Sequence, residues 1–183
     1  SGYKTIIVDA KPSPWLRNRQ EMVVGNILNL EVVNKAISGA ELVYNFAGLA
    51  DINEAINKPL KTAEVNIVGN LNIMNSCVEH NISRFVFAST VYVNSRQGGF
   101  YRCSKQAAEA YLEEYQKSFG LDYTILRYGS LYGPRADHSN GLYRIVKDAL
   151  ETGKLSYIGH PDAMREYIHV ADAANASLEI LKE

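Results

Sequence analysis

The stretch that decides the fold runs from Arg84 to Tyr115 and reads RFVFASTVYVNSRQGGFYRCSKQAAEAYLEEY. Its first seven residues have an apolar centre, FVFA, with aromatic and branched side chains, which predicts a buried β-strand. The segment from Gly99 onward has helical spacing of apolar residues, and Gly120 is the expected cap of a helix that ends near Phe119. A buried strand followed within a few residues by a helix is the repeating unit of a parallel sheet.

The same alternation extends along the chain in both directions. Further strands are predicted at 4–10, 21–26, 41–48, 121–134, 155–159 and 165–170, and further helices at 28–40, 59–81, 141–153 and 171–183. Such alternation is typical of an α/β fold, Rossmann-like and doubly wound, with a mostly parallel sheet and helices on both faces. Ligands bind these sheets at the carboxyl ends of the strands. The candidate residues there are Asp9, Phe46 to Leu49, Ser89, Thr90 and Tyr128 to Gly133.

Composition narrows the possible partners of the chain. Its 183 residues are enough for one domain with a real core, and the composition is that of an ordinary globular protein. A net charge of −1 with scattered Lys and Arg argues against nucleic acid or a membrane as a main partner, and no apolar run reaches the length of a membrane span. Cys77 and Cys103 are predicted to be reduced thiols of a cytoplasmic protein. The four histidines lack metal-ligand spacing, so no metal site is expected.

Tyr101 and Lys105 stand four residues apart and share one face of the predicted helix. The spacing alone is a weak signal, because Tyr143 and Lys147 repeat it in a segment that we interpret as a solvated helix face. The first pair differs in its setting, since it closely follows a buried strand that ends in two hydroxyl residues. A lysine ammonium favours the phenolate and should lower the tyrosine pKa, and the Thr90 hydroxyl could share a substrate proton. These groups predict proton transfer at a carbinol carbon, beside a hydride carrier.

Short stretches with a recognisable order surround this pair. They are TIIVDA, YNFAGLAD, EVNIVGNLNIMNSC, FVFAST, YRCSK, LRYGSLYGP and REYIHVADAA. With them the chain resembles the extended short-chain dehydrogenase/reductase family, in its NAD-dependent nucleotide-sugar epimerase/dehydratase branch. Each stretch is a weak signal by itself, and their common order over nearly the whole chain carries the resemblance.

The resemblance implies a role for each matching residue. Tyr101 would be the acid/base, Lys105 would tune its pKa and bind the ribose, and Thr90 would be the hydroxyl partner. Asp9 would accept the ribose hydroxyls, which favours NAD over NADP because a carboxylate repels the 2′-phosphate, and Lys11 beside it softens that preference. The other residues expected along the cofactor are Ala10, Asn26, Ile27, Phe46, Ala47, Gly48, Leu49, Asn66, Ser89, Tyr128 and Gly129.

Several of these residues also have plainer interpretations. Asp9 could cap a loop, Phe46 could belong to the core, and Asn66 could be a buried amide satisfied by the backbone. Asn26 stands where the family usually has an aspartate, which would weaken a contact with adenine. These alternatives stay open at the level of the sequence.

Departures from the family pattern bear on the reaction and on the extent of the chain. Thr90 is followed by Val91 and Tyr92, where the family's 4,6-dehydratases have an Asp-Glu pair, and this counts against dehydration. No glycine-rich phosphate-binding turn occurs. We therefore interpret the chain as a fragment, a single partial NAD(P)-binding Rossmann-type domain over 1–183 with the start of a substrate-binding part at about 130–183. Without the first strand, the neighbouring strands should lose their shared partner.

Functions of different classes fit these observations. The first is an NAD-dependent nucleotide-sugar epimerase of the UDP-hexose 4-epimerase type, which oxidises a sugar hydroxyl transiently. The second is a catalytically silent fold that serves as a binding or dimerisation module, and a simple NAD(P)-dependent reductase of the same family is a third. The predicted helices at 59–80 and 99–119 are apolar on more than one face. Because these helices pair across a dimer in the family, the resemblance implies a homodimer, with a nucleotide sugar as substrate.

Overall fold

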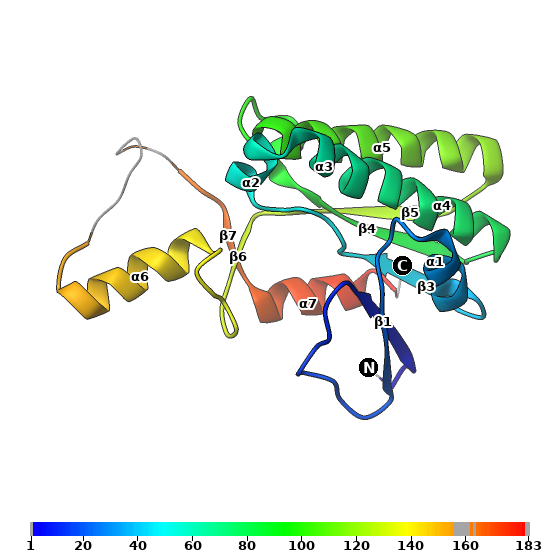
Figure 1. Ribbon diagram of the computed structural model, residues 1–183, viewed down its shortest axis with the longest axis horizontal. Helices are drawn as coiled ribbons and strands as arrows, with labels where there is room; N and C mark the ends of the chain where they lie inside the picture. The colour runs from blue at the N-terminus through cyan, green and yellow to red at the C-terminus, as the bar shows by residue number, and fades with distance from the viewer. Residues whose placement is uncertain (1, 156–161, 163, 182–183) are drawn as a thin grey trace. The chain divides into compact units, whose positions relative to one another are not determined.

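Figure 1 shows the computed structural model, in which residues 2–155, 162 and 164–181 are described. The chain forms two compact units, residues 1–126 and residues 127–183. The first unit holds the predicted alternation of strands and helices. Its elements are β1 Thr5–Asp9, β2 Gln20–Val24, α1 Leu30–Ile37, β3 Leu42–Asn45, α2 Ile52–Asn57, α3 Pro59–Ala63, η1 Glu64–Val68, α4 Gly69–Glu79, β4 Arg84–Thr90, η2 Val91–Asn94, α5 Gly99–Phe119 and most of β5 Tyr123–Tyr128.

The strands of the first unit lie in two separate sheets. β1 pairs with β2 in parallel, with Thr5 opposite Gln20 at one end. β3 pairs with β4 in parallel, and β5 lies on the other side of β4. Among the described residues β1 and β3 do not pair. The parallel α/β architecture is confirmed.

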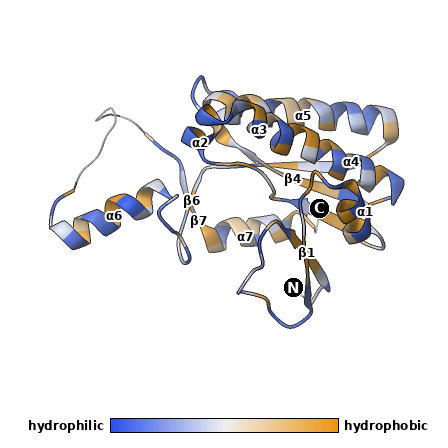
Figure 2. Ribbon diagram, viewed as in Figure 1, coloured by the Kyte–Doolittle hydropathy of each residue, from blue (hydrophilic) through white to orange (hydrophobic). Residues whose placement is uncertain are grey.

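The core of this unit lies between β4 and the helices α1, α4 and α5. Phe85 and Phe87 lie two residues apart and so face the same side of β4, where their rings stack at 6.4 Å. Met74 of α4 and Leu112 of α5 are fully buried with them. Figure 2 shows hydrophobic residues along β4 and on these helices. Burial of each such side chain stabilises the fold by about 1.5–3 kcal/mol, so this packing fixes α5 against β4.

The ends of α5 agree with the sequence. The helix runs over 21 residues from Gly99 to Phe119, as predicted. Gly120 follows with a φ of 71°, in the left-handed region that glycine adopts at little cost, and its N–H donates to the Gln116 carbonyl.

Side chains cap the shorter helices of the unit. Asn29 caps α1 by accepting from the backbone N–H groups of Glu31 and Val32. Asp51 caps α2 by accepting from the N–H of Glu54. α2 is not predicted from the sequence, because six residues without an extended apolar stripe give a weak helical pattern.

The helix predicted as one element over 59–81 is divided in the structure. α3 ends at Ala63, a π-helical turn spans Glu64–Val68 as η1, and α4 begins at Gly69. A π turn accommodates an extra residue in the helical ladder and is frequent at functional sites. Here it contains the fully buried Asn66, whose amide bonds to a different segment of the chain. The prediction of an uninterrupted helix was therefore wrong at this point.

The second unit contains β6 Ser130–Tyr132, α6 Gly141–Thr152, β7 Tyr167–His169 and α7 Val170–Glu179. β6 and β7 pair in parallel, with Ser130 opposite Tyr167. The predicted strand at 155–159 lies outside the described residues, except for Leu155, which belongs to no element.

Tyr143 and Lys147 behave as surface residues of α6, a helix without buried residues. Lys147 Nζ lies 3.2 Å from His138 Nε2 and 3.7 Å from Glu151 Oε1. The Tyr143 ring packs edge-on against the His138 ring. The interpretation of this pair as a solvated helix face is confirmed.

Cys77 and Cys103 are unpaired, and burial raises the pKa of the Cys77 thiol to about 12, so this thiol is chemically inert at neutral pH.

In the part of the chain that the structure describes, the helices are too short or too polar to cross a membrane.

Truncation of a core residue should show how much the packing of α5 contributes. We expect Leu112→Ala to lower the free energy of unfolding by about 2–5 kcal/mol, because it removes a fully buried side chain and leaves a cavity. Urea denaturation followed by circular dichroism measures this change. The control is Leu150→Ala, at a position 81% exposed, which should change the free energy by less than about 0.5 kcal/mol. Equal effects of the two variants would contradict this description of the core.

Candidate active site

Thr90 at the carboxyl end of β4 and Tyr101 in the first turn of α5 form the centre of the candidate site. Their side chains hydrogen-bond to each other. The strand continues directly into η2, where Thr90 Oγ1 accepts from the Tyr92 N–H at 3.3 Å. The structure thus brings together the hydroxyl and the phenol that the sequence singled out, at the end of a central strand.

Lys105 lies one helical turn further along α5 and is only 4% exposed. Its Nζ donates to the Ala88 carbonyl of β4 at 2.8 Å and lies 4.6 Å from the centre of the Phe87 ring. The same atom lies 5.9 Å from the centre of the Tyr101 ring. Burial lowers the pKa of Lys105 to about 8, against an opposing effect of the Glu109 charge. The ammonium is therefore still mostly protonated at neutral pH, although it is almost fully removed from water.

The pKa of Tyr101 differs from the expectation. Burial raises it, the hydrogen bond with Thr90 lowers it, and the nearby Tyr92 phenol raises it again, so that it lies above its ordinary value. The prediction of a lowered pKa was wrong for the protein alone, because loss of water disfavours the phenolate more than its neighbours stabilise it. Tyr101 is consequently protonated at neutral pH in this structure.

Asn66 connects three segments around this pair. Its Oδ1 accepts from the Leu49 N–H at 2.7 Å, and its Nδ2 donates to the Leu49 carbonyl at 3.0 Å and to Ser104 Oγ at 2.9 Å. Ser104 Oγ in turn donates to the Tyr101 carbonyl at 2.8 Å. The interpretation of Asn66 as a buried amide satisfied by the backbone is confirmed, and that backbone is the loop after β3. A place of Asn66 along the cofactor stays a prediction.

Two more buried asparagines extend this network. Asn70 donates to the Asn66 carbonyl, and Asn45 donates to the Asn70 side chain. Asn45 Oδ1 also accepts from the Ala47 N–H at 3.0 Å. Residues 45–49 are thereby tied to the π turn and to α5. A buried polar network that is fully satisfied makes its surroundings rigid.

Gly48 in this loop lies close to the lysine. A Cβ at this position would lie 3.1 Å from Asn66 Oδ1 and 3.6 Å from Lys105 Nζ. The glycine therefore leaves open the space beside the ammonium. The neighbouring Phe46 is 61% exposed and stacks on Tyr44, so its interpretation as a core residue was wrong.

The predicted adenosine-binding residues lie at the ends of β1 and β2. Asp9 is exposed and one of its oxygens accepts from the Lys11 N–H at 2.9 Å, so it does cap the loop that contains Ala10. Asn26 is also exposed and accepts from the Leu28 N–H. Ile27, in contrast, belongs to the core. An adenine contact from Asn26 or Ile27 stays a prediction.

Ser89 and Thr90 have different surroundings, although they are neighbours in β4. The Ser89 hydroxyl donates to Glu109 Oε1 at 2.5 Å, and both residues are buried. Sequence reasoning missed Glu109. The available signal was its position four residues after Lys105 and eight after Tyr101, which places an acid on the helix face of the pair.

Tyr128 and Gly129 belong to the second unit. The Tyr128 hydroxyl lies 2.5 Å from Ser177 Oγ of α7. A Cβ on Gly129 would lie 2.6 Å from the Glu166 carbonyl, so only glycine allows the backbone of this segment to approach β7 so closely. Their contact with a cofactor stays a prediction.

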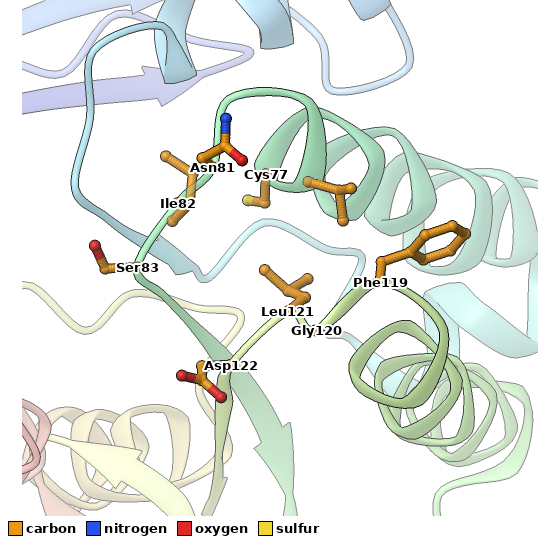
Figure 3. Close-up of a pocket in the computed structure, with 9 residues that line it drawn as sticks. Cys77, Asn81, Ile82, Ser83, Phe119, Gly120, Leu121 and Asp122 are labelled. Atoms are coloured by element: carbon orange, nitrogen blue, oxygen red, sulfur yellow. The ribbon is translucent and has the colours of Figure 1, made fainter.

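A hollow of about 280 Å³ lies elsewhere in the first unit (Figure 3). Its walls are the ends of α4 and α5 and the residues at the amino ends of β4 and β5, among them Cys77, Ser83 and Asp122. The hollow therefore lies at the opposite end of β4 from Thr90. Because ligands of parallel sheets bind at the carboxyl ends of strands, it is not the expected ligand site. Among the described residues no group of three or more His, Cys, Asp or Glu side chains could hold a metal ion.

Comparisons of the sequence point to one family. A model of the NAD dependent epimerase/dehydratase family matches residues 1–183. A candidate UDP-glucose 4-epimerase of Methanocaldococcus jannaschii is 25% identical and aligns with 99% of this chain and 66% of its own length. A dTDP-glucose 4,6-dehydratase of Streptomyces antibioticus is 24% identical over 82% of this chain and 49% of its own length. The chain thus spans about half to two thirds of these curated relatives.

Solved structures give the same result for the fold. UDP-glucose 4-epimerase of Thermotoga maritima with UDP-glucose matches with a TM-score of 0.87 and 26% identity, over 97% of this chain and 65% of that protein. The Thermus thermophilus UDP-glucose 4-epimerase complex with NAD matches with a TM-score of 0.83 and 25% identity, over 97% and 66% of the two chains. The Rossmann-type architecture predicted from the sequence is confirmed.

The depressed pKa of Lys105 predicts how stability varies with pH. The unfolded chain keeps the lysine proton up to about pH 10.5, whereas the folded chain releases it near pH 8. Because the unfolded state then binds more protons at this residue, Lys105 should contribute a rise of roughly 2 kcal/mol to the free energy of unfolding from about pH 7.5 to about pH 9.5. The Cys77 thiol, whose pKa is raised, acts in the opposite direction above about pH 8.5, so the contribution of Lys105 is the difference between the wild type and a variant without this lysine. Urea denaturation at several pH values measures this rise.

The variant Lys105→Met should lack this rise, because it has no proton to release. Lys117→Met removes an exposed lysine from the same helix and should keep the wild-type dependence. A difference in stability between the wild type and Lys105→Met that stays constant over this range would show that Lys105 is not desolvated as described.

Proposed function

The chain belongs to the NAD-dependent epimerase/dehydratase family, and we propose that its whole protein is an NAD-dependent epimerase of a nucleotide sugar. The observation that carries the proposal is the arrangement of Thr90, Tyr101 and Lys105 at the carboxyl end of β4, with Gly48 beside the lysine. A hydroxyl, a phenol and an ammonium are the groups that a reversible proton transfer at a carbinol requires.

The residues present fit the cofactor. Gly48 keeps open the space beside the Lys105 ammonium, which can donate to a ribose hydroxyl. Asp9 is exposed at the end of β1, where a carboxylate can accept from the hydroxyls of a second ribose. This carboxylate favours NAD over NADP. When bound, NAD supplies the acceptor and the later donor of the hydride at the carbinol carbon.

In this proposal Tyr101 moves the hydroxyl proton of the sugar. Its phenolate accepts this proton as the alcohol is oxidised, and its phenol returns the proton when the ketone is reduced. The hydroxyl of Thr90 hydrogen-bonds the phenol and can share that proton. The Lys105 ammonium stabilises the phenolate whenever it forms, which is the state that burial otherwise disfavours.

Epimerisation agrees with the surroundings of Thr90 better than dehydration. Removal of water from the sugar needs a further acid and base beside the threonine. Here Val91 and Tyr92 begin η2 directly after it, and neither side chain is a carboxylate. The names of the relatives support a nucleotide sugar as the substrate class.

Cofactor binding provides the decisive test. We expect micromolar NAD binding by isothermal titration calorimetry, weakened roughly tenfold or more in Tyr101→Phe/Lys105→Ala, because a buried charged hydrogen-bond donor is lost. The matched control is Tyr143→Phe/Lys147→Ala, which removes a pair of identical spacing from the surface of α6 and should leave the affinity unchanged.

The same titration addresses the competing functions. A folded wild-type chain that does not bind NAD would contradict the proposal for this chain and favour a silent binding or dimerisation module. With NAD binding established, an epimerase interconverts two UDP-hexoses without net consumption of NADH. Stoichiometric consumption of NADH would instead indicate a reductase.

We also propose that the chain forms a homodimer through the segments 59–80 and 99–119. Figure 1 shows α3, α4 and α5 side by side in one layer. This layer has several exposed apolar side chains, namely Leu60, Val68, Phe100, Tyr111 and Phe119. Burial of such residues in a second copy would remove them from water.

A charge in this surface should separate the two copies. Leu60 is 81% exposed, and we expect Leu60→Asp to convert a dimer into a monomer without loss of helical content, as measured by analytical ultracentrifugation and circular dichroism. Leu150→Asp, equally exposed on α6, is the control and should leave the mass unchanged. A wild-type chain that sediments as a monomer would contradict the proposed dimer.

A further inference from the structure

We propose that Glu109 is a positioning residue, whose buried carboxylate keeps the Lys105 ammonium charged beside Tyr101. The inference rests on the proposed function for its link to catalysis, but its physical content concerns the protein alone. Glu109 is not placed against the reacting atoms, and it acts through the lysine.

The three residues form a ladder on one face of α5. Tyr101, Lys105 and Glu109 follow each other at intervals of four residues, so that each lies about one turn from the next. Lys105 is 4% exposed and Glu109 is 8% exposed. An isolated carboxylate or ammonium at such burial is strongly unfavourable, and opposite charges close to each other offset part of this cost.

Adjacent residues of β4 hold the two charged groups. The Lys105 ammonium donates to the Ala88 carbonyl at 2.8 Å, and Glu109 Oε1 accepts from the Ser89 hydroxyl at 2.5 Å. Ser89 faces the same side of the strand as Phe87, over whose ring the Lys105 ammonium lies. Both charged groups are therefore held by neighbouring residues of one strand.

The groups around Lys105 differ in what they contribute. On α5 they are Tyr101, which is neutral at neutral pH, and the charged Glu109. β4 contributes the Ala88 carbonyl and the Phe87 ring, and the loop after β3 contributes the backbone at Gly48 and the Asn66 amide. The phenol of Tyr92 in η2 acts on Tyr101. Of these groups, Glu109 is the one whose negative charge opposes the loss of the lysine proton.

The Glu109 charge affects Tyr101 indirectly, through the protonation of Lys105. Burial moves the pKa of Lys105 down to about 8, and the Glu109 charge limits this fall. Without that charge the pKa of Lys105 would fall further, and a smaller fraction of the lysine would stay protonated at neutral pH. A neutral amine does not stabilise the Tyr101 phenolate, so Tyr101 would then be a weaker base.

The experiment titrates Lys105 directly by NMR, through the shift of its Cε in carbon-13 lysine-labelled protein. We expect a pKa near 8 in the wild type and a value lower by about one to three pH units in Glu109→Gln. Glu113→Gln makes the same change at an exposed position one turn further along the helix and should leave the titration unchanged. An unchanged Lys105 pKa in Glu109→Gln would overturn the proposal.

A second variant separates an electrostatic role from a merely structural one. Glutamine keeps the length of Glu109 and can still accept from Ser89, whereas Glu109→Asp keeps the charge and shortens the side chain. We expect the aspartate variant to retain a Lys105 pKa closer to the wild-type value than the glutamine variant does. The opposite order would show that the side chain serves only to bond Ser89. If Glu109→Gln does not fold, an aspartate variant whose Lys105 pKa falls by more than about one unit overturns the proposal by itself.

The role of Glu109 and the proposed function are tested by different measurements, so either one can fail without the other. Absence of NAD binding in the wild type would contradict the proposed function and leave the lysine titration interpretable. Intact NAD binding with an unchanged lysine titration in Glu109→Gln would contradict the role of Glu109 alone. In active protein, the loss of activity at high pH should move to lower pH in Glu109→Gln and stay in place in Glu113→Gln.

Discussion

The ammonium of Lys105 is a positive charge at a place that water hardly reaches, and the surrounding structure depends on how this charge is held. Its Nζ bonds to the Ala88 carbonyl and lies over the Phe87 ring, so the charge can stay only while α5 remains packed against β4. The packing of Phe87 and Leu112 in the core is therefore also the support of the candidate active site. The packing of α5 against β4 thus stabilises the core and also holds the geometry of the candidate site.

Burial shifts the pKa values of Lys105 and Tyr101, the two members of the proposed catalytic pair, in opposite directions. It lowers the pKa of Lys105 and raises that of Tyr101, so both groups tend towards their neutral forms. A proton-transfer site needs charge at the moment of reaction, which this environment opposes. The Thr90 hydroxyl beside the phenol and the carboxylate of Glu109 behind the lysine act in the other direction. The site is thus balanced between desolvation and a few directed polar contacts.

The loop beside the lysine is held by amides instead of charges. Asn45, Asn66 and Asn70 connect it to the π turn and to α5, and Asn66 of the π turn bonds to the backbone of Leu49. Neutral amides can be buried at lower cost than ions and satisfy both donors and acceptors of a backbone. The loop can therefore stay close to Lys105 without adding a charge that would change its pKa.

The sequence by itself determined the α/β class, the position of the strand at 84–90 and the boundaries of α5, because these follow from local periodicity and from a glycine cap. It also predicted that one tyrosine and lysine pair lies at the carboxyl end of a buried strand, since this placement follows from chain order. Only the tertiary structure decided the direction of the Tyr101 pKa, the π turn and the inclusion of Glu109. These depend on desolvation and on contacts between segments far apart in the chain, such as Ser89 with Glu109, which no local pattern records.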